Sequence, residues 1–420
     1  TNFTIESGSA YSVSEDVSMI VKTSGDVVEA VSFFGNKSEI TFPANVTKIG
    51  NYFAQGSPDL VKVNIPAVSS LGNGVFQDCP KLTTAVYAAG ATTTGNNTFQ
   101  NCVALVDVTL PEAATQLGSN LFSGCTALKS VTIPSAVTKI NSGVFTNCSS
   151  LEEVALPSSL TEIVNNLFKG CASLKKIDIP ASVTKIGNTA FQGCTSLVEL
   201  KLPETITTIP TGMIQDCSSI TSITIPESVT TINANAFRNS GLTSFTFPSK
   251  VTAINGTLFM DCKNLKSLTI PATIKTIANG AFQGSGLETL TIPEGITKLS
   301  GSTFKNCLSL TKVVLPASLN TLSGSEFSGC AALKTVEMPG VTKIGNSEFE
   351  KCTALETLTF PEGLTAISTW CCTGCTSLKT INFPSTLTKF NTWAFENCSS
   401  LKSVTIPAAV TSYGSLTFDG

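Results

Sequence analysis

Residues 128–146 read LKSVTIPSAVTKINSGVFT, and this stretch recurs with small changes along most of the chain. Two further copies are LKKIDIPASVTKIGNTAFQGC at residues 174–194 and LKSLTIPATIKTIANGAFQGS at residues 265–285. Their shared pattern is Leu-x-x-Val-x-Ile-Pro-x-x-Val-Thr-x-Ile-x-x-x-x-Phe, with Ile or Leu in place of Val in some copies and Lys275 in place of Thr in the third. Most copies extend it with Cys three residues after the Phe. A short unit repeated in this way predicts an array of stacked structural units.

Phenylalanine marks the period of the repeat, because it recurs every 22 or 23 residues. This series, the Phe column, contains Phe53, Phe76, Phe99, Phe122, Phe145, Phe168, Phe191, Phe237, Phe259, Phe282, Phe304, Phe327, Phe349, Phe395 and Phe418, with Ile214 and Cys372 at two further positions. A unit of this length cannot bury an apolar face alone, so neighbouring units must stack and share a core. The column therefore predicts a buried row of aromatic rings.

The first half of each copy predicts a short strand. Apolar residues alternate with others from Val131 to Ile133, as is typical of a strand with one buried face. Pro134 follows, and proline ends a strand because it has no N–H and a fixed φ. Successive coils would then stack in parallel about 4.8 Å apart. The sequence predicts a mainly β solenoid of short parallel strands.

The repeat resembles the leucine-rich repeats of the BspA-like surface proteins. The copy at Leu174–Phe191 carries the resemblance most clearly, and the copy at Ile220–Phe237 has Ile in the leading Leu position. The resemblance covers residues 38 to 418 and implies a curved, right-handed leucine-rich repeat solenoid. It also implies a cell-surface or secreted protein that binds host matrix proteins or other cells. It implies no particular binding residues.

The pattern divides the chain into two parts. Residues 1–38 lack the repeat but alternate like strands, so we expect a β-rich N-terminal cap over the first coil. Residues 39–420 are expected to form the solenoid, with about 16–17 coils at this repeat length. The final coil is expected to be incomplete, because the sequence stops in mid-repeat at Gly420.

Composition excludes several classes of function. Charged residues make up 13% of the chain and the net charge is −3, which argues against a nucleic-acid partner. No apolar run approaches the roughly 18 residues that span a bilayer, so we expect no membrane span in this chain. The chain has no histidine, which removes Ser-His and Cys-His nucleophiles and His-ligated metals. Carboxylates such as Glu152, Glu153 and Glu199 fall at outward positions of the repeat. We therefore expect no enzyme activity, catalytic residue, cofactor or metal.

Fifteen cysteines raise the question of disulfides. Most form a second column, three residues after the Phe column, with Ser240 and Ser285 replacing Cys in two coils. Buried free thiols are the favoured interpretation, because free Cys packs as a small apolar residue. Bridges between coils are the alternative. The Cys372–Cys375 motif has a metal or redox alternative, but Cys372 and Cys375 occupy the regular Phe and Cys positions of the repeat.

The outward residues of the strand before each proline form the first candidate binding surface. In four consecutive coils these are hydroxyl residues: Ser222, Thr224, Ser244, Thr246, Ser267, Thr269, Thr289 and Thr291. Such residues suit cross-strand pairing, which is a purely structural role. The functional alternative is a neutral surface that binds a protein or glycan partner.

Two further candidates interrupt the uniform pattern. Glu153, Lys176, Asp178, Glu199 and Lys201 replace the hydroxyl residues in earlier coils, either to pair with one another or to meet a partner. Trp370 and Trp393 are 23 residues apart and should stack on adjacent coils. Tryptophan is frequent at binding hot spots, although packing against the turn would also explain the pair.

The sequence therefore favours an extracellular or cell-surface protein that adheres to host matrix proteins or cells, through a protein or glycan partner. Self-association is the alternative, because stacking of one solenoid on another would build a filament or surface coat.

Overall fold

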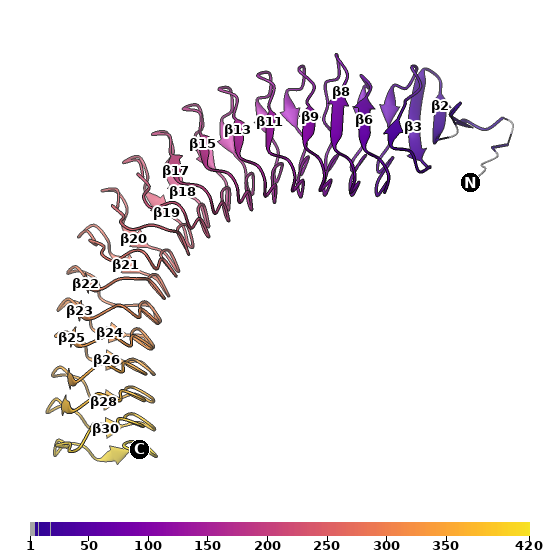
Figure 1. The fold of residues 1–420 in the computed structure, drawn as a ribbon. Helices are drawn as coiled ribbons and strands as arrows, with labels where there is room; N and C mark the ends of the chain where they lie inside the picture. The colour runs from indigo at the N-terminus through magenta and orange to yellow at the C-terminus, as the bar shows by residue number, and fades with distance from the viewer. Residues whose placement is uncertain (1–4, 7, 17) are drawn as a thin grey trace. The chain divides into compact units, whose positions relative to one another are not determined.

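The protein is built from short strands and turns. The computed structural model describes residues 5–6, 8–16 and 18–420, and these contain no helix. They form two compact units, Thr1–Ile206 and Thr207–Gly420, and each unit is a stack of coils (Figure 1). The predicted class, a mainly β solenoid of stacked parallel strands, is confirmed.

Three antiparallel strands precede the first coils of unit 1: β1 (Tyr11–Val13), β2 (Met19–Ser24) and β3 (Val27–Phe33). Strand β3 pairs in parallel with β5 (Lys48–Ile49), so this sheet continues into the stack. Residues 1–4, 7 and 17 of the predicted cap lie outside the described residues. The division of the chain into a cap of residues 1–38 and a solenoid of residues 39–420 stays a prediction.

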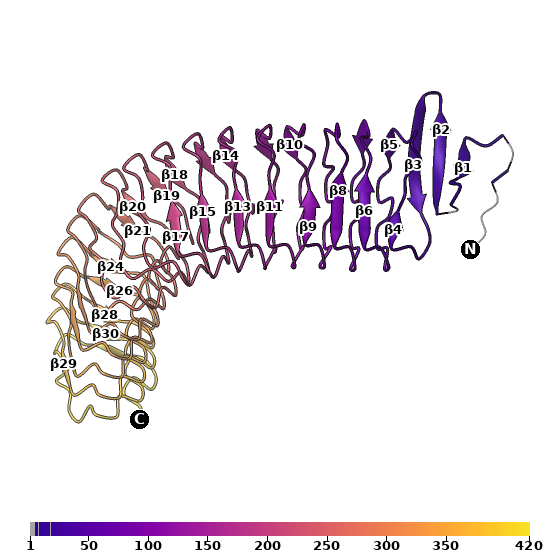
Figure 2. The same cartoon turned by 45° about the horizontal axis from the view of Figure 1, so that its top comes forward.

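Most coils contribute a strand before the proline, a two-residue strand after it, or both. In unit 1 the pre-proline strands are β4 (Glu39–Ile40), β6 (Lys62–Ile65), β9 (Asp107–Thr109), β11 (Ser130–Thr132), β13 (Glu153–Ala155), β15 (Lys176–Asp178) and β17 (Glu199–Lys201). Strand β8 (Thr84–Tyr87) belongs to the same row, although Ala88 follows it in place of a proline. The second strands there are β5, β7 (Ser70–Leu71), β10 (Gln116–Leu117), β12 (Lys139–Ile140), β14 (Glu162–Ile163) and β16 (Lys185–Ile186). Figure 2 shows the two kinds of strand as separate rows in this unit.

Unit 2 has the same two rows. Its pre-proline strands are β22 (Thr289–Thr291), β23 (Lys312–Val314), β25 (Thr335–Glu337), β27 (Thr357–Thr359) and β29 (Thr380–Asn382). Its second strands are β18 (Thr208–Ile209), β19 (Thr231–Ile232), β20 (Ala253–Ile254), β21 (Thr276–Ile277), β24 (Thr321–Leu322), β26 (Lys343–Ile344), β28 (Ala366–Ile367), β30 (Lys389–Phe390) and β31 (Ser412–Tyr413).

Pairing between coils is parallel and shifted by one repeat. Val131 lies opposite Val154, and Ile163 lies opposite Ile186. Each residue type therefore stacks on its own copy in the next coil, which explains why the sequence pattern has to be kept over so many units.

The most regular part of each coil is the turn around its column phenylalanine, residues 143–147 and their equivalents, which we call the Phe turn. The N–H groups of Gly143, Phe145 and Asn147 donate to carbonyls of the next coil at 3.3, 3.1 and 2.6 Å. Gly143 and Asn147 have φ of 72° and 59°. Left-handed backbone of this kind suits Gly and Asn, which explains why the turn is rich in both.

The Phe column forms the predicted aromatic core. Ring centroids of Phe122, Phe145 and Phe168 are 5.8 and 5.5 Å apart with nearly parallel planes. In unit 2 the rings of Phe282 and Phe304 are likewise 5.5 Å apart. These side chains are fully buried. Such spacing lies within the range of favourable aromatic pairs.

One member of the predicted column is wrong. Ala54, not Phe53, occupies the column position of its coil, because its N–H donates to Val75 O as that of Phe76 donates to Thr98 O. Phe53 instead packs on Phe33 and Phe42, with ring centroids 6.1 and 5.4 Å apart. Phe53 and Ala54 are adjacent and both apolar, so the 23-residue spacing between Phe53 and Phe76 did not show which of the two lies in the column.

The cysteines are confirmed as buried free thiols. Each regular thiol donates to the column-Phe carbonyl of the preceding coil, as Cys125 Sγ does to Phe99 O at 3.0 Å and Cys148 Sγ to Phe122 O at 3.1 Å. Burial raises the pKa of Cys148 to about 12. A thiol that stays protonated is a poor nucleophile and metal ligand, so Cys148 joins two coils as an uncharged hydrogen-bond donor.

The Cys-x-x-Cys motif follows the same pattern. Cys371, Cys372 and Cys375 are fully buried, and Cys375 Sγ donates to Phe349 O at 3.0 Å. Burial is the main cause that raises the pKa of Cys372 well above its usual value. Cys372 therefore fills the column as an uncharged packing residue.

Candidate functional site

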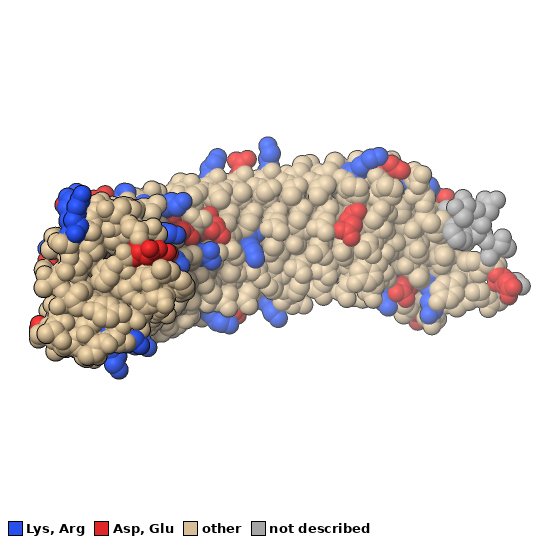
Figure 3. Space-filling view, turned by 90° about the horizontal axis from the view of Figure 1, so that it is seen from below, with Lys and Arg blue, Asp and Glu red and all other residues tan. Residues whose placement is uncertain are grey.

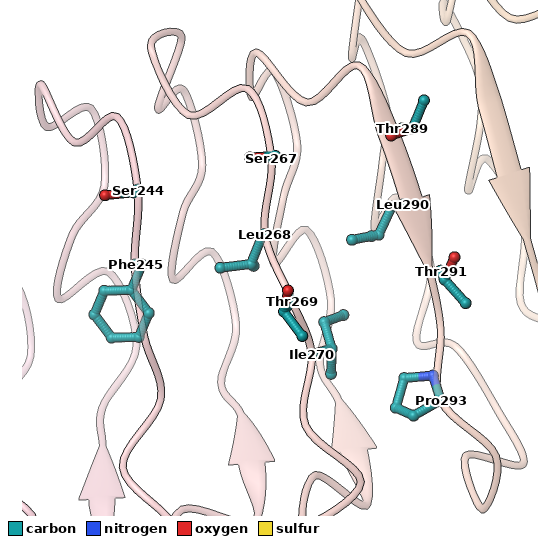
Figure 4. Close-up of a pocket in the computed structure, with 10 residues that line it drawn as sticks. All are labelled: Ser244, Phe245, Ser267, Leu268, Thr269, Ile270, Thr289, Leu290, Thr291 and Pro293. Atoms are coloured by element: carbon teal, nitrogen blue, oxygen red, sulfur yellow. The ribbon is translucent and has the colours of Figure 1, made fainter.

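A shallow groove of about 470 Å³ lies across three coils of unit 2 (Figure 4). Its hydroxyl residues are Ser244, Ser267, Thr269, Thr289 and Thr291. Phe245, Leu268, Ile270, Leu290 and Pro293 supply the apolar part. The ten lining side chains carry no charge, so the groove offers hydroxyl groups above an apolar floor.

The structure brings five of the eight predicted hydroxyl residues into this groove. Ser222, Thr224 and Thr246 are exposed on the same surface but do not line it. All eight side chains are exposed, so their predicted outward direction is confirmed.

The expected strands, however, are mostly missing here. Only Thr289–Thr291 forms a strand, β22, whereas residues 222–224, 244–246 and 267–269 are not in strands. Strand β22 pairs with β23 and with no strand on its other side. Cross-strand hydroxyl pairing therefore does not explain this surface, and Leu268 is half-buried where its equivalents Val131 and Leu290 are buried. Alternation predicted which way the side chains point, but it did not predict whether the backbones pair.

Trp370 and Trp393 stack as predicted. Their ring centroids are 5.5 Å apart and their planes differ by 2°. Trp370 remains 41% exposed despite the stacking, and Trp393 is half-buried. The pair therefore lies at the surface and is not packed away beneath the turn.

The backbone at both tryptophans is left-handed, as it is at the equivalent position of other coils. Each has a φ of 56° and lies two residues before the Phe-column position, where neighbouring coils have Ser325 and Ser347. A bulky side chain in this left-handed region costs on the order of 1–3 kcal/mol. Tyr52 and Leu416 have the same left-handed backbone at the equivalent positions of their coils, so the turn imposes it.

The third candidate, the charged group in unit 1, contains residues of opposite sign on neighbouring strands. Lys176 lies opposite Glu199, and Asp178 lies opposite Lys201. Lys176 Nζ is also 3.2 Å from an Asp178 carboxylate oxygen. Opposite charges facing each other stabilise a sheet, so pairing between β15 and β17 gives Lys176, Asp178, Glu199 and Lys201 a structural role. Figure 3 shows charges of both signs scattered over a largely uncharged face.

The sequence matches the BspA-type leucine-rich repeat region over residues 17–129, 115–243, 230–341 and 325–420. The chain belongs to the BspA-type leucine-rich repeat proteins. No curated protein matches the sequence of this BspA-type chain.

Solved structures of bacterial repeat proteins are similar to this BspA-type chain. A leucine-rich repeat protein from Bacteroides ovatus ATCC 8483 shares 25% identity, with 96% of this chain and 94% of that chain covered and a TM-score of 0.59. A leucine-rich cell surface protein from Faecalibacterium prausnitzii A2-165 shares 21% identity over 98% of each chain, with a TM-score of 0.42. A leucine-rich repeat protein from T. pallidum shares 26% identity over 47% of this chain and 92% of its own, with a TM-score of 0.40.

The described residues of the BspA-type chain include no cluster of three or more His, Cys, Asp or Glu placed to hold a metal. Within the same residues, no helix is long and apolar enough to cross a membrane.

Our sequence interpretation missed two carboxylates. Glu326 and Glu348 directly precede Phe327 and Phe349 in the sequence, and both are fully buried. Equivalent positions hold Leu121 and Val144, so the repeat register alone could have placed these two carboxylates inside the core.

Proposed function

We propose that this BspA-type protein is a non-enzymatic interaction protein, extracellular or on a cell surface, that adheres to host matrix proteins or cells through unit 2. The observation that carries the proposal is the Trp370–Trp393 stack at the surface, at a position where the two preceding coils have Ser. Tryptophan supplies a large apolar contact area and a hydrogen-bonding N–H, which is why it is frequent at binding hot spots.

The hydroxyl groove supports the same proposal. Its exposed Ser and Thr residues can donate or accept hydrogen bonds, and its half-buried Leu268 offers apolar contact. A neutral surface of this kind suits a protein or glycan partner and does not favour a highly charged one. Contacts spread over several coils would add to those of the tryptophan pair.

The test is binding of the purified chain to immobilised matrix proteins and to a glycan array. The double variant Trp370→Asn/Trp393→Asn should bind its partner at least about tenfold more weakly, a loss of about 1.4 kcal/mol. The variant Thr269→Lys/Thr289→Lys should also bind more weakly, because lysine would fill the groove with charge. Thr132→Lys, on β11 of unit 1, is the matched control and should bind like the natural sequence.

Two results would contradict the proposal. The first is unchanged affinity in both variants, and the second is no binding to any matrix protein, glycan or host cell. The alternative function, a filament or coat subunit, stays a prediction, and negative-stain images that show only single particles would contradict it.

A further inference from the structure

Four consecutive coils of unit 2 have an unusual residue directly before the Phe-column position. This pre-Phe position is buried and apolar in most coils, as at Leu121, but here it holds Thr303, Glu326, Glu348 and Cys371. All four side chains are 0% exposed. Two ionisable carboxyl groups thus lie on neighbouring coils inside the core, where a charge is costly unless it is compensated.

Three backbone hydrogen bonds stabilise the buried carboxylate of Glu326. Its Oε1 accepts hydrogen bonds from the N–H groups of Gly301 at 2.8 Å and Ser323 at 3.0 Å. Its Oε2 accepts one from the N–H of Thr303 at 2.9 Å. These three donors are what a buried carboxylate, which can only accept hydrogen bonds, requires.

Glu348, one coil further, has no such partners. Its two carboxyl oxygens and Thr303 Oγ1 are the buried side-chain oxygens and nitrogens that lack a hydrogen bond among the described residues. Burial first, then the Glu326 charge and then Cys371, raise the pKa of Glu348 well above its usual value, against a smaller lowering effect of the Glu326 N–H. Cys352, in the same coil, interacts with Glu348 as well. Glu326, Cys371 and Cys352 are thus the titratable groups that face it.

The coil of Glu348 is bonded directly to the coil of Trp370. The N–H groups of Ser347, Phe349 and Lys351 donate to carbonyls of Thr369, Cys371 and Thr373 at 3.0, 2.7 and 2.8 Å. The Trp370 N–H in turn donates to Thr392 O at 3.3 Å. Any loosening at Glu348 therefore reaches the tryptophan coils through backbone hydrogen bonds.

We propose that Glu348 is a buried proton-binding site whose neutral acid form stabilises the stacked coils of unit 2. When it ionises, the proton passes to solvent and the packing of the coils that carry Trp370 and Trp393 loosens. A second carboxylate beside Glu326 would lie in the core without the three hydrogen bonds that stabilise the first. The inference does not depend on the proposed function, since no ligand takes part.

The direction of the pH dependence follows from linkage. Below the usual Glu pKa of about 4.3 the carboxyl is protonated in both folded and unfolded chains, and it then has no effect on their balance. Above that pH the unfolded chain loses the proton and the folded chain keeps it. The equilibrium constant for unfolding should therefore rise about tenfold per pH unit until the folded-state pKa is reached, and level off beyond it.

The experiment compares the full chain with Glu348→Gln, which keeps the shape of the neutral acid and cannot ionise. Denaturant unfolding is measured at a series of pH values from acid to alkaline. The equilibrium constant for unfolding should rise with pH in the natural sequence, and the part of that rise due to one proton should be missing in Glu348→Gln. Fluorescence reports the site directly, because Trp370 and Trp393 are the only tryptophans. Their emission should change with alkaline pH in the natural sequence and stay constant in the variant.

Two further variants sharpen the test. Glu326→Gln removes the neighbouring charge, so it should lower the pKa of Glu348. The pH range over which the equilibrium constant for unfolding rises should then become narrower. Glu350→Gln removes a carboxylate that pairs with Lys351 at 3.6 Å in the same coil, and it should behave like the natural sequence.

Identical pH profiles for the natural sequence and Glu348→Gln would overturn the proposal. If Glu348→Gln does not fold, infrared spectroscopy of the natural sequence still decides. A protonated-carboxyl carbonyl band at neutral pH, where exposed carboxyls are ionised, is the expected result, and its absence overturns the proposal.

Discussion

The Phe turn and the pre-proline segment belong to the same coils and follow different rules. Around Phe145 and Phe304 alike, backbone N–H groups bond to the next coil and the rings stack. Before proline, residues 130–132 pair as strands, whereas residues 267–269 do not. The difference shows that the turn holds the stack together, which leaves the pre-proline surface free to vary.

The largest effect should come from breaking the Phe column. Phe145→Ala would leave a cavity between the rings of Phe122 and Phe168, and should lower the free energy of unfolding by about 3–5 kcal/mol. Val198→Ala, at an exposed residue next to β17, should change it by less than about 0.5 kcal/mol. Denaturant unfolding of both variants measures the contrast. Equal losses would show that the turn does not dominate stability.

Trp370→Asn tests the strained position in the Phe turn and should have a smaller effect. Asn tolerates the left-handed backbone better, but the stacking with Trp393 is lost, a contribution of about 0.5–1.5 kcal/mol. Because these two effects oppose each other, the free energy of unfolding should change by less than about 1 kcal/mol, whereas partner binding weakens. A loss of stability like that of Phe145→Ala would mean that the tryptophan pair is structural.

The smallest effect concerns the proline-following carboxylates on the variable side of the coil. Glu294 accepts hydrogen bonds from the N–H groups of Ala317 at 3.0 Å and Ser318 at 3.2 Å, and these lower its pKa. Its contribution to stability is present above the unfolded-state pKa and is lost as the pH falls through the lower folded-state pKa.

Glu294→Gln should therefore reduce the loss of stability in acid, which thermal unfolding at a series of acidic pH values would measure. Glu153→Gln removes an exposed carboxylate from β13 and serves as the control. If both variants follow the same acid profile, the hydrogen bonds of Glu294 contribute nothing measurable. The direction is opposite to that expected for Glu348, whose neutral form is the stable one.

Much of the molecule was predictable because side-chain chemistry repeats with the coil. The period gave the stacked β solenoid, the buried Cys thiols and the stacked Trp370–Trp393 pair, since equivalent residues of adjacent coils must meet. The error in the Phe column arose where two residues satisfied the same pattern. Phe53 and Ala54 are both apolar, and only the hydrogen bond from the Ala54 N–H to Val75 O shows which one enters the column.

The sequence by itself determined the repeat unit, the inward and outward faces and the family of this protein, because these follow from the order of apolar and polar residues. Only the tertiary structure decided which neighbouring segments form hydrogen bonds, and so where the groove at Ser267 and Thr289 lies. It also decided that Glu326 accepts three backbone hydrogen bonds, whereas the Glu348 oxygens accept no comparable bond among the described residues. Those outcomes depend on distances between coils, and the spacing of residues along one chain does not specify them.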